Sequence, residues 1–183
     1  IGGVGLSGDV NGDALDRIAA SGVIAVMRGV DRDRAVETAR ALVRGGVGAV
    51  ELTADAPGAV DAVADVAAAL GDEAVVGAGT GMDAATASRA VAAGAEFGVA
   101  PHTDPATVET CNRHGVPTIP GVQTPTEAVR AVEAGAHAGK LFPAATGGAG
   151  HLAAPPGPPP PIPLVPTRGR VAATGGACFA AGA

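Results

Sequence analysis

The sequence predicts a single α/β domain folded as a (β/α)8 (TIM) barrel. Short apolar runs rich in β-branched residues recur roughly every 20–26 residues, the length of a minimal strand–helix unit, and a segment with helical spacing separates most of them. Near-continuous apolar strands that alternate with helices are typical of a parallel sheet covered by helices. An open doubly wound sheet is the alternative, but no Gly-x-Gly-x-x-Gly follows the first expected strand.

The expected elements alternate along the chain. The glycine-rich residues 1–10 are expected to be frayed, and a leading helix is expected over residues 13–20. Several helices end at a glycine-containing turn, which is a common stop signal. The expected strands are 23–27, 49–53, 74–78, 97–100, 118–122, 139–142 and 162–165, and the expected helices are 33–43, 57–70, 83–94, 104–114 and 125–135.

The proline-rich residues 153–163 are expected to form an extended loop. Proline lacks the backbone N–H and its ring clashes with the preceding helical turn, so this segment cannot be helical. Because it leads directly into the last strand-like run, we interpret it as a stiff connector within the domain and not as an exposed ligand for another protein.

Composition limits the class of protein. The 183 residues fit one domain over residues 1–183, and 47% are hydrophobic although only 2% are aromatic. The core must therefore be built from small aliphatic side chains. A net charge of −6 without a basic stripe argues against a nucleic-acid partner. Two distant cysteines, no membrane-length apolar run and no signal pattern lead us to expect a cytoplasmic protein without a membrane partner.

Two charged residues lie inside apolar, strand-like runs. Lys140 is the only lysine of the chain, and Glu51 lies in the second expected strand. Side chains alternate along a strand, so Glu51 shares a face with Thr53 and Lys140 shares a face with Phe142. In a parallel barrel the carboxyl ends of all strands meet at one mouth, where active sites are built. The amine and the carboxylate can therefore converge there.

This pair is suited to Schiff-base chemistry. Burial disfavours the charged form of an amine, and the neutral form can attack a carbonyl carbon. A neighbouring carboxylate can move the protons that such a reaction requires. The alternative is an inactive barrel or a binding module in which Lys140 and Glu51 form only a structural ion pair.

Other motifs are weaker. The glycine-rich turn at residues 77–81 could cradle a phosphate, but such a turn is more often tight packing. The four histidines lie in separate segments, so we expect no metal site.

Four motifs occur in order at residues 45–53 (GGVGAVELT), 76–80 (VGAGT), 119–122 (IPGV) and 140–143 (KLFP). This set resembles the 2-keto-3-deoxy-6-phosphogluconate (KDPG) and 4-hydroxy-2-oxoglutarate (KHG) aldolases, class I enzymes on a trimeric (β/α)8 barrel. The resemblance implies a lyase that cleaves a small keto-acid substrate without metal or organic cofactor. It also implies a homotrimer.

The resemblance assigns roles to individual residues. Lys140 would form the Schiff base with pyruvate, and Glu51 would act as general acid and base through water. Thr80 would hold the pyruvate carboxylate, and Phe142 with Pro101 would line the pocket. The remaining substrate-binding residues implied are Arg28, Thr53, Thr167 and Gly169.

The chain departs from the family pattern at three places. Asp55 stands where some members carry a carboxylate-binding arginine. Arg168 replaces the first glycine of the family's Pro-Thr-Gly-Gly turn, for which residues 174–176 are a competing match. The sequence ends before the family's eighth strand and its Gly-Ser phosphate contact, so we expect an incomplete eighth unit. An aldolase for KHG or for an unphosphorylated keto-deoxy acid is favoured if Arg168 blocks phosphate.

Overall fold

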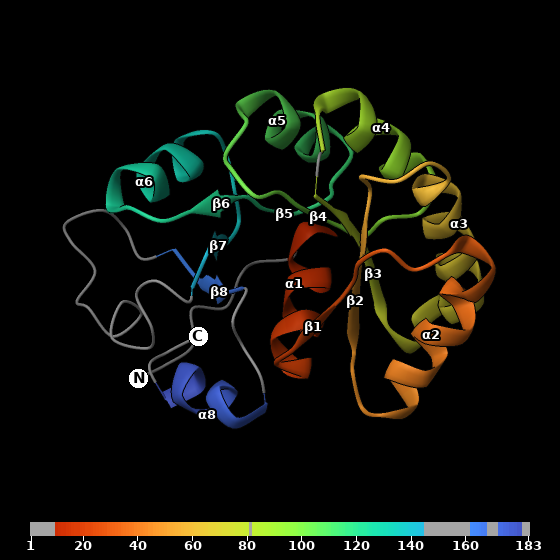
Figure 1. Cartoon of the computed structure of the whole chain (residues 1–183). Helices are drawn as coiled ribbons and strands as arrows, with labels where there is room; N and C mark the ends of the chain where they lie inside the picture. The colour runs from red at the N-terminus through yellow and green to blue at the C-terminus, as the bar shows by residue number, and fades with distance from the viewer. Residues whose placement is uncertain (1–9, 81, 145–161, 168–171, 181–183) are drawn as a thin grey trace.

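The computed structural model describes residues 10–80, 82–144, 162–167 and 172–180 (Figure 1). Residues 1–9 and 153–161, expected to be frayed and extended respectively, lie outside the described residues. The strands are β1 (Ile24–Met27), β2 (Ala49–Thr53), β3 (Val75–Gly79), β4 (Phe97–Val99), β5 (Thr118–Ile119), β6 (Gly121–Val122), β7 (Gly139–Leu141) and β8 (Leu164–Pro166). The helices are α1 (Val10–Ser21), α2 (Arg32–Arg44), α3 (Ala59–Leu70), the 3-10 turn η1 (Gly71–Glu73), α4 (Ala84–Ala92), α5 (Pro105–Arg113), α6 (Pro125–Glu133) and α8 (Ala172–Ala180).

The predicted α/β fold with parallel strands is confirmed. Strands β1 to β5 form one parallel sheet in sequence order, and β6 to β8 form a second. The two sheets continue one another because β5 and β6 are the halves of the single expected strand 118–122. Pro120 lies between them and has no N–H to donate to a ladder.

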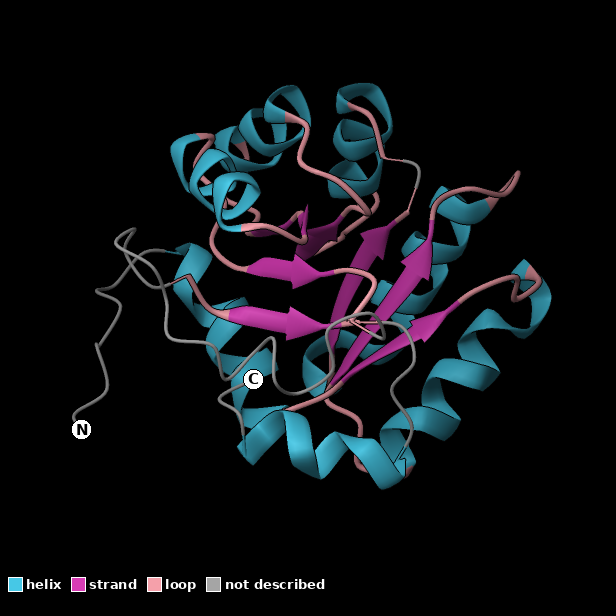
Figure 2. Ribbon diagram, turned by 60° about the vertical axis from the view of Figure 1, so that its left-hand side comes forward, coloured by secondary structure: helices cyan, strands magenta, loops and turns pink. Residues whose placement is uncertain are grey.

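The strands follow a curved path with helices on its outer side (Figures 1 and 2). Within the described part of the chain, no strand pairs with the outer edge of β1 or of β8. The ring of strands is therefore not closed by hydrogen bonds there. Helices α2 to α6 begin and end close to their predicted limits, and α1 starts earlier than expected, at Val10. No limits were predicted for α8.

Three helices at the carboxyl ends of the strands have strong start signals. The Asp83 side chain accepts a hydrogen bond from the Thr86 N–H at the start of α4, and Asp104 does the same for the first turn of α5. Thr124 and Glu127 form a reciprocal capping box at the start of α6. Such caps satisfy the free N–H groups of the first helical turn. They also fix where the loops after β3, β4 and β6 end.

Two apolar clusters lie on opposite faces of the strands. The outer cluster joins alternate strand residues such as Val50 and Leu52 to the helices, with Val63 and Val66 of α3 among its members. The inner cluster joins the other strand residues to Ala14 and Ile18 of α1. Helix α1 packs against β2 and β3 on this inner side. Side chains alternate along each strand, so Glu51 points to the same inner side as this cluster. The inward positions that α1 does not cover are available for a site.

Glycines replace side chains where the inner face is crowded. Glu51, Gly77 and Phe97 are register partners on the adjacent strands β2, β3 and β4. The Phe97 ring lies over Gly77, so a Cβ placed at Gly77 would meet ring atoms at 2.4 Å. In a core with so few aromatic residues, this ring fills space that the small aliphatic side chains leave open.

A Gly77→Ala substitution is therefore expected to destabilise the fold by about 1–3 kcal/mol, the usual cost of forcing extra volume into a packed core. Urea unfolding of the variant and of wild type measures the difference. Gly98→Ala is the matched control, because that glycine is also in the sheet and its added Cβ would meet only side-chain atoms at 3.2 Å or more. A Gly77→Ala variant as stable as Gly98→Ala would contradict the packing role of Gly77.

Candidate active site

Lys140 lies in the middle of β7 and is buried, with 4% of its surface exposed. The strand is hydrogen-bonded on both sides, to β6 and to β8, which fixes its position. The Lys140 ammonium lies 5.2 Å from the centre of the Phe142 ring, a distance at which the ring face attracts a cation. Burial lowers the pKa of Lys140, the negative charge of Glu51 opposes that change, and the positive charge of Arg28 adds to it. A larger share of the amine is therefore neutral than for a lysine in water.

Glu51 is the second buried ionisable residue of the site, with 2% of its surface exposed. Burial raises the pKa of its carboxyl group, and the positive charges of Lys140 and Arg28 only partly offset that effect. Its Oε1 atom is buried and has no hydrogen-bond partner within the described residues. A buried acceptor without a partner is costly, so this oxygen is poised for a water or a substrate atom.

Lys140 and Glu51 influence one another's charge without touching. Each appears among the charges that shift the other's pKa, yet the ion pairs among the described residues do not include this pair. Their charged atoms are therefore not within ion-pair distance of one another. A carboxyl group of raised pKa near an amine of lowered pKa is a combination suited to acid–base and nucleophilic work.

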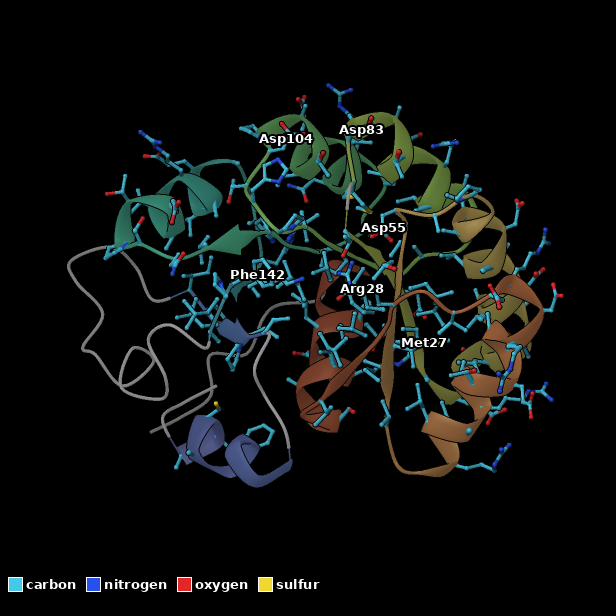
Figure 3. The ribbon with its side chains drawn as sticks, viewed as in Figure 1. Met27, Arg28, Asp55, Asp83, Asp104 and Phe142 are labelled. Carbon is cyan, nitrogen blue, oxygen red and sulfur yellow. The ribbon has the colours of Figure 1, made fainter. Side chains whose placement is uncertain are left out.

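The mouth of the barrel next to this pair carries an exposed polar cluster. One Arg28 nitrogen contacts Asp55 at 3.1 Å, and the other donates a hydrogen bond to the Thr80 hydroxyl at 3.0 Å. These residues follow β1, β2 and β3, and Arg28 and Asp55 lie together in Figure 3. Thr80 has φ +61°, a strained conformation for a β-branched residue that is often found at functional sites.

Asp55, one of the three departures from the pattern that the sequence resembles, forms an ion pair with Arg28. Asp55 contacts Arg28 from the neighbouring strand end and so holds a positive charge near the mouth. The two side chains are 57% and 40% exposed, so the pair contributes little to stability.

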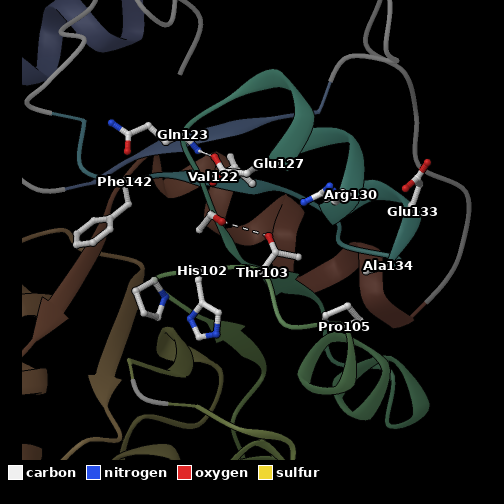
Figure 4. A pocket seen from close by; sticks show the side chains of 12 residues that line it. His102, Thr103, Pro105, Val122, Gln123, Glu127, Arg130, Glu133, Ala134 and Phe142 are labelled. Atoms are coloured by element: carbon white, nitrogen blue, oxygen red, sulfur yellow. Dashed lines mark hydrogen bonds between the residues drawn. The ribbon is translucent and has the colours of Figure 1, made fainter.

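Phe142, whose ring lies near Lys140, also lines a cavity of about 750 Å³ (Figure 4). The cavity is lined by the loop after β4, the end of β6 and one face of α6. Its described lining residues are Pro101, His102, Thr103, Pro105, Gly121, Val122, Gln123, Glu127, Arg130, Glu133, Ala134 and Phe142. Neither Lys140 nor Glu51 is among them. The buried pair, unlike the lining of this cavity, combines an amine of lowered pKa with a carboxyl group of raised pKa.

The other predicted residues take different positions. Thr53 is buried at the end of β2, on the same face as Glu51. The Thr167 hydroxyl donates to the Val165 carbonyl at 3.3 Å, and the Thr167 backbone joins the ends of β7 and β8. Arg168, Gly169 and Gly81 lie outside the described residues. Of the expected glycine-rich turn at 77–81, residues 77–79 belong to strand β3. Gly77 and Gly79 make room there for neighbouring side chains, which agrees with the packing interpretation.

Sequence reasoning missed the contribution of α6 to the cavity. Glu127, Arg130 and Ala134 are spaced as residues on one helical face. That spacing could have shown a shared face, but nothing in the sequence indicated that this face lines a cavity. No cluster of His, Cys, Asp and Glu suitable for a metal is found among the described residues, and no helix there could cross a membrane.

Known proteins resemble this chain in sequence. It is 39% identical over 132 residues to the 2-dehydro-3-deoxy-phosphogluconate aldolase of Treponema pallidum (strain Nichols), which covers 72% of this chain and 61% of the relative. It is 31% identical over 122 residues to a probable 2-dehydro-3-deoxy-6-phosphogalactonate aldolase of Rhizobium meliloti (strain 1021), covering 67% and 58%. The chain thus spans about three fifths of the length of these relatives.

Solved structures resemble it as well. A native KDPGal structure superposes with a TM-score of 0.82 at 29% identity, covering 87% of this chain and 78% of that one. A KDPG aldolase from Legionella pneumophila, with pyruvate captured as a covalent carbinolamine intermediate, gives 0.80 at 29% identity, covering 93% and 81%. The family model for KDPG and KHG aldolase matches residues 15–176, and the chain belongs to this family.

Proposed function

We propose that this protein is a class I aldolase that reversibly cleaves KDPG into pyruvate and glyceraldehyde 3-phosphate through a Schiff base on Lys140. The observation that carries the proposal is the buried Lys140 amine, with its lowered pKa, within electrostatic reach of the buried Glu51 carboxyl but not paired with it. A purely structural pair would be expected to be in direct contact, since contact is what compensates two buried charges.

The proposed reaction begins when the neutral Lys140 amine attacks the C2 keto carbon of the substrate. Glu51 supplies the proton that allows water to leave, which gives the iminium ion. Removal of the C4 hydroxyl proton then breaks the C3–C4 bond, because the iminium accepts the electron pair as an enamine. The aldehyde departs, the enamine is protonated at C3, and water hydrolyses the pyruvyl iminium to release pyruvate and the free amine.

The surrounding residues have supporting roles in this proposal. Arg28 and Thr80, which already contact one another, would bind the substrate carboxylate at the mouth. Phe142 and Pro101 would form an apolar wall, and Thr53, Thr167 and Gly169 would contact the remainder of the substrate. A homotrimer and a cytoplasmic location are further proposals from family membership. Light scattering of the purified protein tests the trimer.

A second substrate class is supported by the relatives themselves, which are named for two different sugars. Cleavage of a phosphogalactonate analogue, of KHG or of an unphosphorylated keto-deoxy acid would use the same Lys140 chemistry with different distal contacts. We expect phosphorylated substrates to give the higher kcat/KM. Coupled pyruvate assays with matched phosphorylated and unphosphorylated substrates check this, and a preference for the unphosphorylated compound or for KHG would overturn the KDPG assignment while leaving the lysine mechanism intact.

Substitution of the two central residues should affect turnover differently. Lys140→Met is expected to abolish cleavage, because no other side-chain amine is present in the chain. Glu51→Gln is expected to lower kcat by about 10²-fold or more while leaving the fold intact, which is the usual contribution of a general acid–base. Pyruvate release is the measurement. Full activity of either variant would sink the proposed mechanism.

The raised pKa of Glu51 has a consequence for stability. A carboxyl whose folded pKa lies above its unfolded value binds its proton more tightly when folded, so stability falls as pH rises between the two values. Glu51→Gln removes this cost. The variant should therefore unfold at a higher temperature than wild type at pH 7. The difference should disappear below about pH 4, where Glu51 is protonated in both states. Thermal unfolding across this range measures it, and a variant less stable at pH 7 would show that burial does not dominate.

A further inference from the structure

The Glu51 side chain lies over Gly79 and not over its own register partner. Glu51 is paired with Gly77 across β2 and β3, and Gly79 is two residues further along β3 on the same face. The space over Gly77 is filled by the Phe97 ring. A Cβ placed on Gly79 would lie 2.1 Å from Glu51 Oε1, 2.6 Å from Cδ and 3.0 Å from Cγ. The carboxylate therefore occupies the volume that a side chain at position 79 would need.

This close approach differs from the others in the sheet. At Gly121 an added Cβ would meet the Pro101 backbone at 2.0 Å, and at Gly77 it would meet a buried ring. Those neighbours cannot move without disturbing the fold. At Gly79 the obstructing atoms are the end of a flexible side chain, which can rotate away. A side chain at position 79 would thus displace the Glu51 carboxylate while the strands stay in place.

We infer that Gly79 is a positioning residue for Glu51. Because Gly79 has no side chain, it leaves a space, here called the seat, in which the Glu51 carboxylate lies with its unpartnered Oε1 in the barrel mouth. The inference rests on the proposed function for its catalytic consequence, but the seat itself is a feature of the geometry. It also accounts for the second glycine of the glycine-rich stretch 77–81 without a bound phosphate. Gly79 does not touch the substrate and acts only through Glu51.

The inference is tested with Gly79→Ala in wild type and in a Glu51→Gln background, with Gly98→Ala as the control for adding a methyl group to the sheet. Glutamine has nearly the shape of glutamate, so steric effects on the fold are matched in the two backgrounds. Two quantities are measured: kcat for KDPG cleavage and the titration midpoint of Lys140. Because Lys140 is the only lysine, NMR of protein labelled with [13Cε]lysine gives a single resonance to follow.

In wild type, Gly79→Ala is expected to lower kcat by about 10- to 100-fold, within the usual contribution of a general acid–base, with KM nearly unchanged. It is also expected to move the Lys140 midpoint by about half a pH unit or more, because the Glu51 charge acting on Lys140 is displaced. In the Glu51→Gln background the same substitution should change neither quantity appreciably. Gly98→Ala should leave both near wild type.

An unchanged Lys140 midpoint after Gly79→Ala, or an equal change in both backgrounds, would overturn the positioning role. That result is distinct from failure of the proposed function, which would show as wild-type protein that does not cleave KDPG. The titration midpoint of Lys140 can be measured without turnover. It therefore tests whether Gly79 positions Glu51, whether or not the protein cleaves KDPG.

Discussion

Burial of one amine and one carboxyl group on the inner side of the strands is the constraint on which the rest of the structure depends. Each group resists its charged form, and burial is the first cause of both pKa shifts. A pair in direct contact would compensate this cost by mutual attraction, but Lys140 and Glu51 are not in contact. Under the proposed function, this uncompensated cost is what leaves the two groups available for proton exchange with a substrate.

The sheet accommodates the buried Glu51 side chain because Gly77 and Gly79 on the neighbouring strand have no side chains. Phe97 fills the inner face over Gly77, and Glu51 is left with the space over Gly79. Helix α1 packs on the inner face of β2 and β3 and contributes to the inner core. The exposed Arg28–Asp55 pair and the strained Thr80 lie at the opposite, carboxyl end. Apolar packing by α1 and the polar residues at the carboxyl ends of the strands are thus separated along the strands, as is usual in barrels of this type.

Much of the fold could be predicted from the sequence because its signals are local. Apolar runs and glycine stops located the strands and helices to within a few residues, and alternation placed Glu51 and Thr53 on the inner face. The sequence did not show that the strand 118–122 is interrupted at Pro120, because that depends on which backbone N–H groups form the hydrogen bonds between strands. The cavity beside α6 and the Arg28–Asp55 contact depend on how distant elements pack, and sequence spacing does not report that. The seat at Gly79 could not be predicted for the same reason, because the sequence does not show which side chain from a neighbouring strand approaches a glycine.

The most direct test of the central claim is reduction with borohydride in the presence of pyruvate, followed by peptide mapping. Lys140 carries the only side-chain amine of the chain, so the location of an adduct is unambiguous. A Schiff-base aldolase predicts a reduced pyruvyl group on Lys140, formed only when pyruvate and borohydride are both present. Active protein with an unmodified Lys140, or with the adduct confined to the terminal amine, would contradict the assignment.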